Sequence, residues 1–198
     1  DRAILETLYS TGIRRAELIN LGLYDLDIER GILSIRQGKG KKDRIIPIGE
    51  RAVQWIEKYL NEVRPEFSCN TDEGNLFLSY RGKSIDPDMM TIIVRKYITK
   101  ANIGKKGSCH TFRHTMATLM LENGADIRFI QAMLGHVNLE TTEIYTRVSI
   151  KKLKEIHTKS HPAKAHRSRK TDWNQEITAE DLLEELKREE QEETEDTK

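Results

Sequence analysis

The apolar and polar residues of this sequence follow helical spacing from its first positions onward. Ala3, Ile4 and Leu8 recur at helical intervals, and Gly12 then interrupts the pattern. Because no capping sequence precedes these residues, we expect the chain to begin partway through an element, with further chain upstream. The pattern therefore predicts a helix that ends near Gly12 and is followed directly by a second one.

The middle of the sequence changes to short runs that are typical of β-strands. The runs over 24–28, 32–35 and 44–48 are predicted strands, and a loop rich in glycine and lysine divides the last two. A loop over 65–74 precedes a short buried strand over 76–78. Helical periodicity predicts the remaining elements, which are helices over 13–21, 50–63, 88–101, 111–123, 126–134, 139–147 and 150–160. The fold class expected is α+β: a mainly helical domain with a small three-stranded antiparallel sheet.

Composition narrows the class of protein. The 198 residues suffice for one domain with a real core, and 33% of them are charged. The longest apolar run, over 45–49, is too short for a transmembrane helix, and no basic and apolar leader suggests secretion. Cys69 and Cys109 do not make a disulfide framework. We therefore expect a reduced, cytoplasmic location without membrane contact.

The net charge of +1 conceals an uneven distribution along the chain. Residues 151–170 hold eight basic residues and one acidic residue, whereas residues 176–198 hold three basic and eleven acidic ones. We expect a basic linker over 161–175 and an acidic, weakly helical tail over 176–198. The basic block indicates either a polyanionic partner such as nucleic acid or a solvated helix face. The tail either folds back onto the basic block or remains a solvated extension.

A His-x-x-Arg motif begins one of the predicted helices. His110 and Arg113 lie one helical turn apart, and backbone N–H groups at a helix N-terminus favour an anion such as a phosphate oxygen. The alternative is a capped helix with polar surface residues. His110 and His114, beside Cys109, also have the spacing of metal ligands, but no third ligand follows at a suitable distance. A metal site is not expected.

Other candidate residues stand at turns and on short helices. Glu17, three residues after Arg14, can hold its guanidinium, although ordinary surface ion pairs share this spacing. Lys39 lies between two glycines at the tip of the predicted hairpin, where it could contact phosphate, protonate a leaving oxygen or simply be solvated. His136 follows a glycine helix stop, and Tyr145 lies on a short helix. The alternative for His136 is an ordinary loop histidine, and the alternative for Tyr145 is a half-buried aromatic residue.

The joint order of these residues carries more information than any single one. It runs Arg, Lys, His-x-x-Arg, His, Tyr, and the sequence resembles the tyrosine recombinase (phage integrase) family, most closely its Xer-type and phage-integrase-like members. The resemblance covers about residues 1–160. The matching stretches are Thr-Gly-Ile-Arg-Arg-Ala-Glu-Leu at 11–18, Gly-Lys-Gly-Lys-Lys-Asp-Arg-Ile-Ile-Pro-Ile at 38–48, His-Thr-Phe-Arg-His-Thr-Met-Ala-Thr at 110–118, Leu-Gly-His at 134–136 and Thr-Thr-Glu-Ile-Tyr-Thr at 141–146.

The resemblance implies the fold of a tyrosine recombinase catalytic core and a set of catalytic roles. Two arginines would hold the nonbridging oxygens of a scissile DNA phosphate, two histidines would handle hydrogen bonds and protons, and a lysine would protonate the leaving oxygen. The tyrosine would attack phosphorus, giving a 3′-phosphotyrosyl bond and a free 5′-hydroxyl. In chain order the implied catalytic residues are Arg14, Lys39, His110, Arg113, His136 and Tyr145, with Glu17 supporting Arg14.

The resemblance also implies partners. Arg36, Lys41, Lys42 and Arg44, around the hairpin, are expected to contact double-stranded DNA. We expect the protein to assemble on DNA as a tetrameric synapse, either of identical subunits (a homo-oligomer) or together with a second recombinase. No cofactor, metal or ATP is expected. Only thirteen residues precede Arg14, so the N-terminal DNA-binding domain of the family is not in this sequence.

Three other functions are compatible with parts of the pattern. A non-catalytic DNA-binding remnant would keep the fold without activity, and a type IB topoisomerase would use similar chemistry to relax DNA. The Leu-Gly-His and Thr-Thr-x-x-Tyr motifs favour the recombinase over the topoisomerase. A metal-dependent nuclease would need carboxylate clusters near the histidines, which the sequence does not show.

Overall fold

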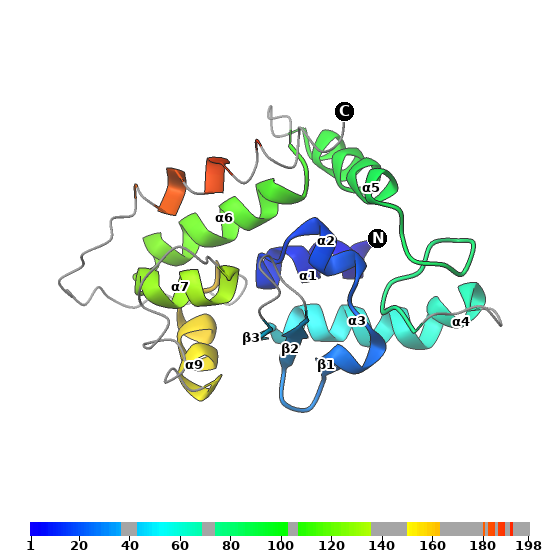
Figure 1. Ribbon diagram of the computed structural model, residues 1–198, viewed down its shortest axis with the longest axis horizontal. Helices are drawn as coiled ribbons and strands as arrows, with labels where there is room; N and C mark the ends of the chain where they lie inside the picture. The colour runs from blue at the N-terminus through cyan, green and yellow to red at the C-terminus, as the bar shows by residue number, and fades with distance from the viewer. Residues whose placement is uncertain are drawn as a thin grey trace.

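The helices account for most of the structure (Figure 1). The computed structural model describes residues 1–36, 43–68, 74–102, 107–135 and 150–162, together with 180, 182–184, 186–188 and 191. The helices are α1 (Arg2–Thr11), α2 (Arg15–Ile19), α3 (Glu50–Glu62), α4 (Arg64–Phe67), α5 (Pro87–Lys100), α6 (Cys109–Glu122), α7 (Ile127–Leu134) and α9 (Ile150–Ser160). The helix predicted over 139–147 lies outside the described residues.

The three strands form one antiparallel sheet in the order β1-β2-β3, which confirms the predicted α+β architecture. They are β1 (Leu26–Asp27), β2 (Ile32–Ile35) and β3 (Arg44–Pro47). Leu33 of β2 pairs with Ile46 of β3, and both are buried, whereas Ile45 on the opposite face is half exposed. Side chains alternate between the two faces of a strand, so one face of this small sheet reaches the core.

Two segments differ from the expected strands and a third from the expected loop. The run over 24–28 begins as a 3-10 turn, because the Asp25 carboxylate accepts a hydrogen bond from the Gly22 amide at 2.8 Å and closes the turn. The run over 76–78 is buried but makes a single isolated bridge, between Leu78 and Ser84, since an apolar run is equally compatible with buried irregular backbone. The short helix α4, Arg64–Phe67, extends into the start of the loop expected over 65–74.

Helix α1 occupies the centre of the molecule, where it packs against α3 and α6 (Figure 1). Its apolar side, which includes the fully buried Leu8, joins the hydrophobic core with residues of the sheet and of α3 and α6. Gly12 ends α1 in the left-handed conformation, with φ of 61°. The chain then turns back immediately into α2, so the segment around Arg14 is anchored on the core.

Part of the acidic tail is docked on the same core. Leu182 and Leu186 are buried in it, Leu183 packs against it, and the described tail residues are drawn near α6 (Figure 1). Contact between the acidic side chains of the tail and the basic block over 151–170 stays a prediction. Within the described residues, every helix is too short or too polar to cross a membrane.

Candidate functional site

Arg113 of α6 is an almost fully buried arginine, with 1% of its surface exposed. Its Nη1 donates a hydrogen bond to the Gly12 carbonyl at 2.6 Å, and its Nη2 donates to the Leu134 carbonyl at 3.0 Å. The side chain therefore ties α6 to the turn after α1 and to the end of α7. His110, one turn earlier on α6, is also buried. The two residues of the His-x-x-Arg motif thus lie inside the protein at the start of one helix.

Arg14 stands at the N-cap of α2, two residues after the carbonyl that Arg113 holds. Its backbone N–H donates to Glu17 Oε2 at 2.9 Å, and its Nη1 donates to Glu17 Oε1 at 3.2 Å. The i, i+3 pair expected from the spacing is therefore formed. Because Glu17 caps the helix with one oxygen and holds the guanidinium with the other, the backbone and side chain of Arg14 are fixed together.

Arg44 of β3 completes this cluster from a third direction. Its Nη1 and Nη2 donate to the two carboxylate oxygens of Glu17 at 2.7 and 2.8 Å. Burial alone would raise the pKa of Glu17, but the hydrogen bonds and charge of Arg44, with those of Arg14, hold the pKa below its ordinary value. Glu17 is therefore a buried carboxylate that remains charged between two arginines.

Two of the four residues expected to contact DNA, Arg36 and Arg44, are described by the structure, and they differ in exposure. Arg36 has 67% of its side chain exposed and pairs with Asp25 at 2.7 Å, which leaves it at the surface. Arg44 has 13% of its side chain exposed and is held by Glu17, so the structure places it inside the protein. Lys41 and Lys42 lie outside the described residues. The same is true of three expected catalytic residues, Lys39, His136 and Tyr145.

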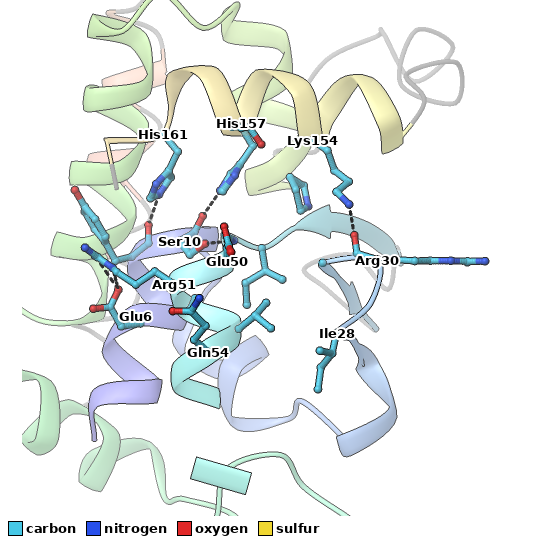
Figure 2. A pocket seen from close by; sticks show the side chains of 18 of the residues that line it. Glu6, Ser10, Ile28, Arg30, Glu50, Arg51, Gln54, Lys154, His157 and His161 are labelled. Atoms are coloured by element: carbon cyan, nitrogen blue, oxygen red, sulfur yellow. Dashed lines mark hydrogen bonds and ion pairs between the residues drawn. The ribbon is translucent and has the colours of Figure 1, made fainter. Parts of the chain in front are cut away.

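A separate pocket of about 730 Å³ lies between α1, α3, α9 and the turn joining β1 to β2 (Figure 2). It contains none of the residues singled out above. His157 of α9 and His161, directly after its end, point toward α1, where their Nε2 atoms face the carbonyl oxygens of Ser10 at 2.8 Å and Tyr9 at 2.9 Å, respectively. Burial lowers the pKa of His161. These histidines hold the end of α9 against α1. In the sequence, their i, i+4 spacing indicates only that they share one face of a helix.

The described parts of the chain contain no group of three or more His, Cys, Asp or Glu side chains that could hold a metal ion. Cys109, the sulfur candidate beside His110, is itself buried.

Sequence reasoning missed the role of Gly135 in this arrangement. The residue ends α7 with φ of 69°, and a Cβ there would lie 2.9 Å from the Arg44 Cζ. Only glycine combines this left-handed backbone with so close an approach of a guanidinium. The Leu-Gly pair that follows the periodic pattern of α7 signals the helix end, but nothing local indicates the arginine packed against it.

Comparisons with known proteins identify similar sequences and structures. The model of the phage integrase family matches residues 1–152. Tyrosine recombinase XerC 2 of Ralstonia nicotianae is 50% identical over 167 residues, which cover 84% of this chain and 48% of the relative. The crystal structure of XerA recombinase has a TM-score of 0.63 and 41% identity, over 81% of this chain and 57% of that one.

A DNA complex is also among the similar structures. It is XerH site-specific recombinase bound to palindromic difH substrate in a post-cleavage complex, with a TM-score of 0.60 and 27% identity over 79% of this chain and 44% of that one. The chain spans about half the length of the curated relatives that it matches.

Proposed function

This chain belongs to the phage integrase family of tyrosine recombinases, and from that premise we propose that it is the catalytic part of a site-specific DNA recombinase. It breaks and rejoins DNA strands through a covalent 3′-phosphotyrosyl intermediate, without metal or ATP. The observation that carries the proposal is the junction at Gly12. There the buried Arg113 holds the carbonyl two residues before Arg14, although the two arginines are far apart in the sequence.

The chemistry explains why two fixed arginines are suited to this reaction. Attack on a phosphodiester places additional negative charge on the oxygens of a pentacoordinate phosphorus. Arg14 and Arg113 are held by a carboxylate and by two carbonyls respectively, so their positive charge is oriented before the substrate arrives. Loss of one such donor costs roughly 10²–10³ in rate in other enzymes. His110, in the first turn of α6, supplies a further hydrogen bond in this proposal.

The remaining roles follow the family motif. Tyr145 is the nucleophile. A tyrosine phenol in water has a pKa of about 10, so nearby positive charge must assist the deprotonation of such a nucleophile at neutral pH. Lys39 protonates the leaving 5′-oxygen, and His136 contributes to binding the phosphate. The phosphotyrosyl ester conserves the energy of the broken bond, which allows rejoining without ATP.

The partners proposed are double-stranded DNA and further copies of a recombinase. The XerH relative in its difH complex supports DNA as the substrate. Exchange between two duplexes requires cleavage of four strands, and each copy offers one Tyr145. We therefore propose a synapse of four subunits, either identical or mixed with a second recombinase.

A suicide-substrate assay tests the proposal. The probe is a pool of 5′-labelled duplexes of randomised sequence, each nicked just downstream of its centre, so that the short fragment with the freed 5′-hydroxyl diffuses away. We expect a labelled covalent complex on denaturing gels, formed in the presence of EDTA and lost in Tyr145→Phe. Tyr24→Phe is the matched control because Tyr24 is almost fully exposed. DNA binding without a covalent complex would identify a binding remnant instead, and relaxation of supercoiled DNA without site preference would identify a topoisomerase.

A further inference from the structure

Arg44 is held inside the protein by bonds from every nitrogen of its guanidinium. Its two terminal nitrogens bind both oxygens of Glu17, and its Nε donates to the Met133 carbonyl at 2.9 Å. All three guanidinium nitrogens therefore hold protein atoms. A planar guanidinium suits this geometry, since it makes two parallel bonds to a carboxylate and a third at its edge.

Glu17 links Arg44 to the catalytic arginine. Its Oε1 accepts from Arg44 Nη1 at 2.7 Å and from Arg14 Nη1 at 3.2 Å, so one oxygen is shared between the two guanidiniums. The side chain of Glu17 is only 5% exposed. If Arg44 were absent, this buried charge would retain Arg14 as its remaining ionic partner among the contacts described here, and a closer pairing would displace the Arg14 guanidinium.

The other end of Arg44 holds the end of α7. The carbonyls of a helix C-terminus lack partners within the helix and carry the negative end of its dipole. Arg44 binds the Met133 carbonyl, Arg113 binds the Leu134 carbonyl, and the backbone of Gly135 packs directly against the Arg44 guanidinium. The two arginines thus fix the last residues of α7 from opposite elements, β3 and α6.

We propose that Arg44 is a positioning residue for strand cleavage, and that it does not contact DNA. Through Glu17 it sets the position of the Arg14 guanidinium, and through Met133 and Gly135 it fixes the end of α7. This inference rests on the function proposed above, in which Arg14 holds the scissile phosphate. It replaces the expectation that Arg44 belongs to the DNA-contacting residues of the hairpin.

The first test separates positioning from DNA contact. Arg44→Met keeps an unbranched apolar stem and removes the charge and the donors of the guanidinium. Under single-turnover conditions with saturating nicked duplex, we expect the rate of covalent-complex formation to fall by about 10²-fold, as for a reacting group misplaced by roughly 1 Å. The salt dependence of duplex affinity, measured by fluorescence anisotropy, should be unchanged. A salt slope reduced by about 0.9 with a normal cleavage rate would show a phosphate contact and overturn the proposal.

The second test separates positioning from a general loss of folding. A misfolded fraction lowers the final amount of covalent complex, whereas a misplaced guanidinium lowers the rate and leaves that amount unchanged. Arg51→Met is the control, because Arg51 also forms an ion pair with a buried glutamate, Glu6, at 2.8 Å, and makes no described contact with Glu17 or α7. We expect the control to cleave like the unaltered chain. A reduced end point in Arg44→Met at an unchanged rate would assign Arg44 to stability alone.

Two further variants examine the link through Glu17. Arg44→Lys retains the charge but not the paired bonds, so it should recover part of the rate. Arg44→Met combined with Glu17→Gln should cleave no more slowly than the slower single variant, because both changes act on the same arginine. Fully additive losses would contradict action through Glu17. If the unaltered chain forms no covalent complex, the proposed function itself fails, an outcome distinct from normal cleavage by Arg44→Met.

Discussion

Replacement of Gly12 by alanine should damage the site more than its small size suggests. Gly12 has a left-handed backbone with φ of 61°, and its carbonyl accepts the 2.6 Å hydrogen bond from Arg113. A Cβ at this position would overlap the Cε of Met116 and lie 3.0 Å from the Cδ2 of Leu134. Both neighbours are fully buried, so neither can move without disturbing the core.

The expected loss of folding stability in Gly12→Ala has two contributions. The left-handed conformation costs an alanine roughly 1 kcal/mol relative to glycine. Overpacking of a filled core adds about 1–3 kcal/mol. Together they lower the free energy of unfolding by about 2–4 kcal/mol, which moves a urea midpoint by about 1–2 M for a slope near 2 kcal/mol/M. The bond to Arg113 should be displaced as well, so the folded variant should also cleave DNA more slowly.

Gly124→Ala is the matched control for this prediction. Gly124 also has a left-handed backbone, with φ of 81°, but no atom lies within 4 Å of a Cβ built there. Its variant should lose only the conformational part, a midpoint shift of about 0.5 M, and should cleave normally. Urea unfolding followed by circular dichroism measures both variants. Equal shifts for the two variants would refute the argument that Gly12 is required for packing.

Three other predictions follow from the site, α9 and the tail. Lys39→Ala should slow cleavage of normal DNA far more than of DNA with a 5′-bridging sulfur, because a thiolate leaves without an acid; equal slowing would assign Lys39 to DNA positioning. Because burial lowers the pKa of His161, the unfolded form binds more protons as the pH falls below about 6.5, and the hold of α9 on α1 weakens. Hydrogen exchange of the α9 amides should show this loss, and protection that is independent of pH would contradict it. Deletion of 176–198 should tighten nonspecific DNA binding at low salt and steepen its salt dependence, and unchanged values would make the tail a bystander.

The sequence was most informative where structure is set locally. The glycines at 12 and 135 end helices in the left-handed conformation, and the helix expected over 50–63 forms as α3 over Glu50–Glu62. Helical periodicity persists over many residues, so its prediction does not depend on distant partners. The short strand-like runs were less informative, because a single carboxylate at Asp25 was enough to convert the start of one into a 3-10 turn.

The arginines show why the site could be predicted only in part. Arg14, Arg44 and Arg113 are alike in sequence, and motif order alone assigned two of them to catalysis and one to DNA. Their environments depend on partners that are remote in the chain: Arg44 bonds to a carbonyl 89 residues away, and Arg113 to one 101 residues away. The local sequence around an arginine does not show which remote residues it will contact.

A count of basic residues therefore overstates the DNA-binding surface of such a domain. Arg36 and Arg44 flank the same hairpin loop, yet Arg36 has 67% of its side chain exposed and Arg44 has 13%. A buried charge is already compensated inside the protein, so it adds little to the release of counterions when DNA binds. The charge that remains available for counterion release on DNA is the exposed part alone. In a domain whose site is built from buried arginines, the salt dependence of DNA affinity reports the exposed residues, while the cleavage rate reports the buried ones.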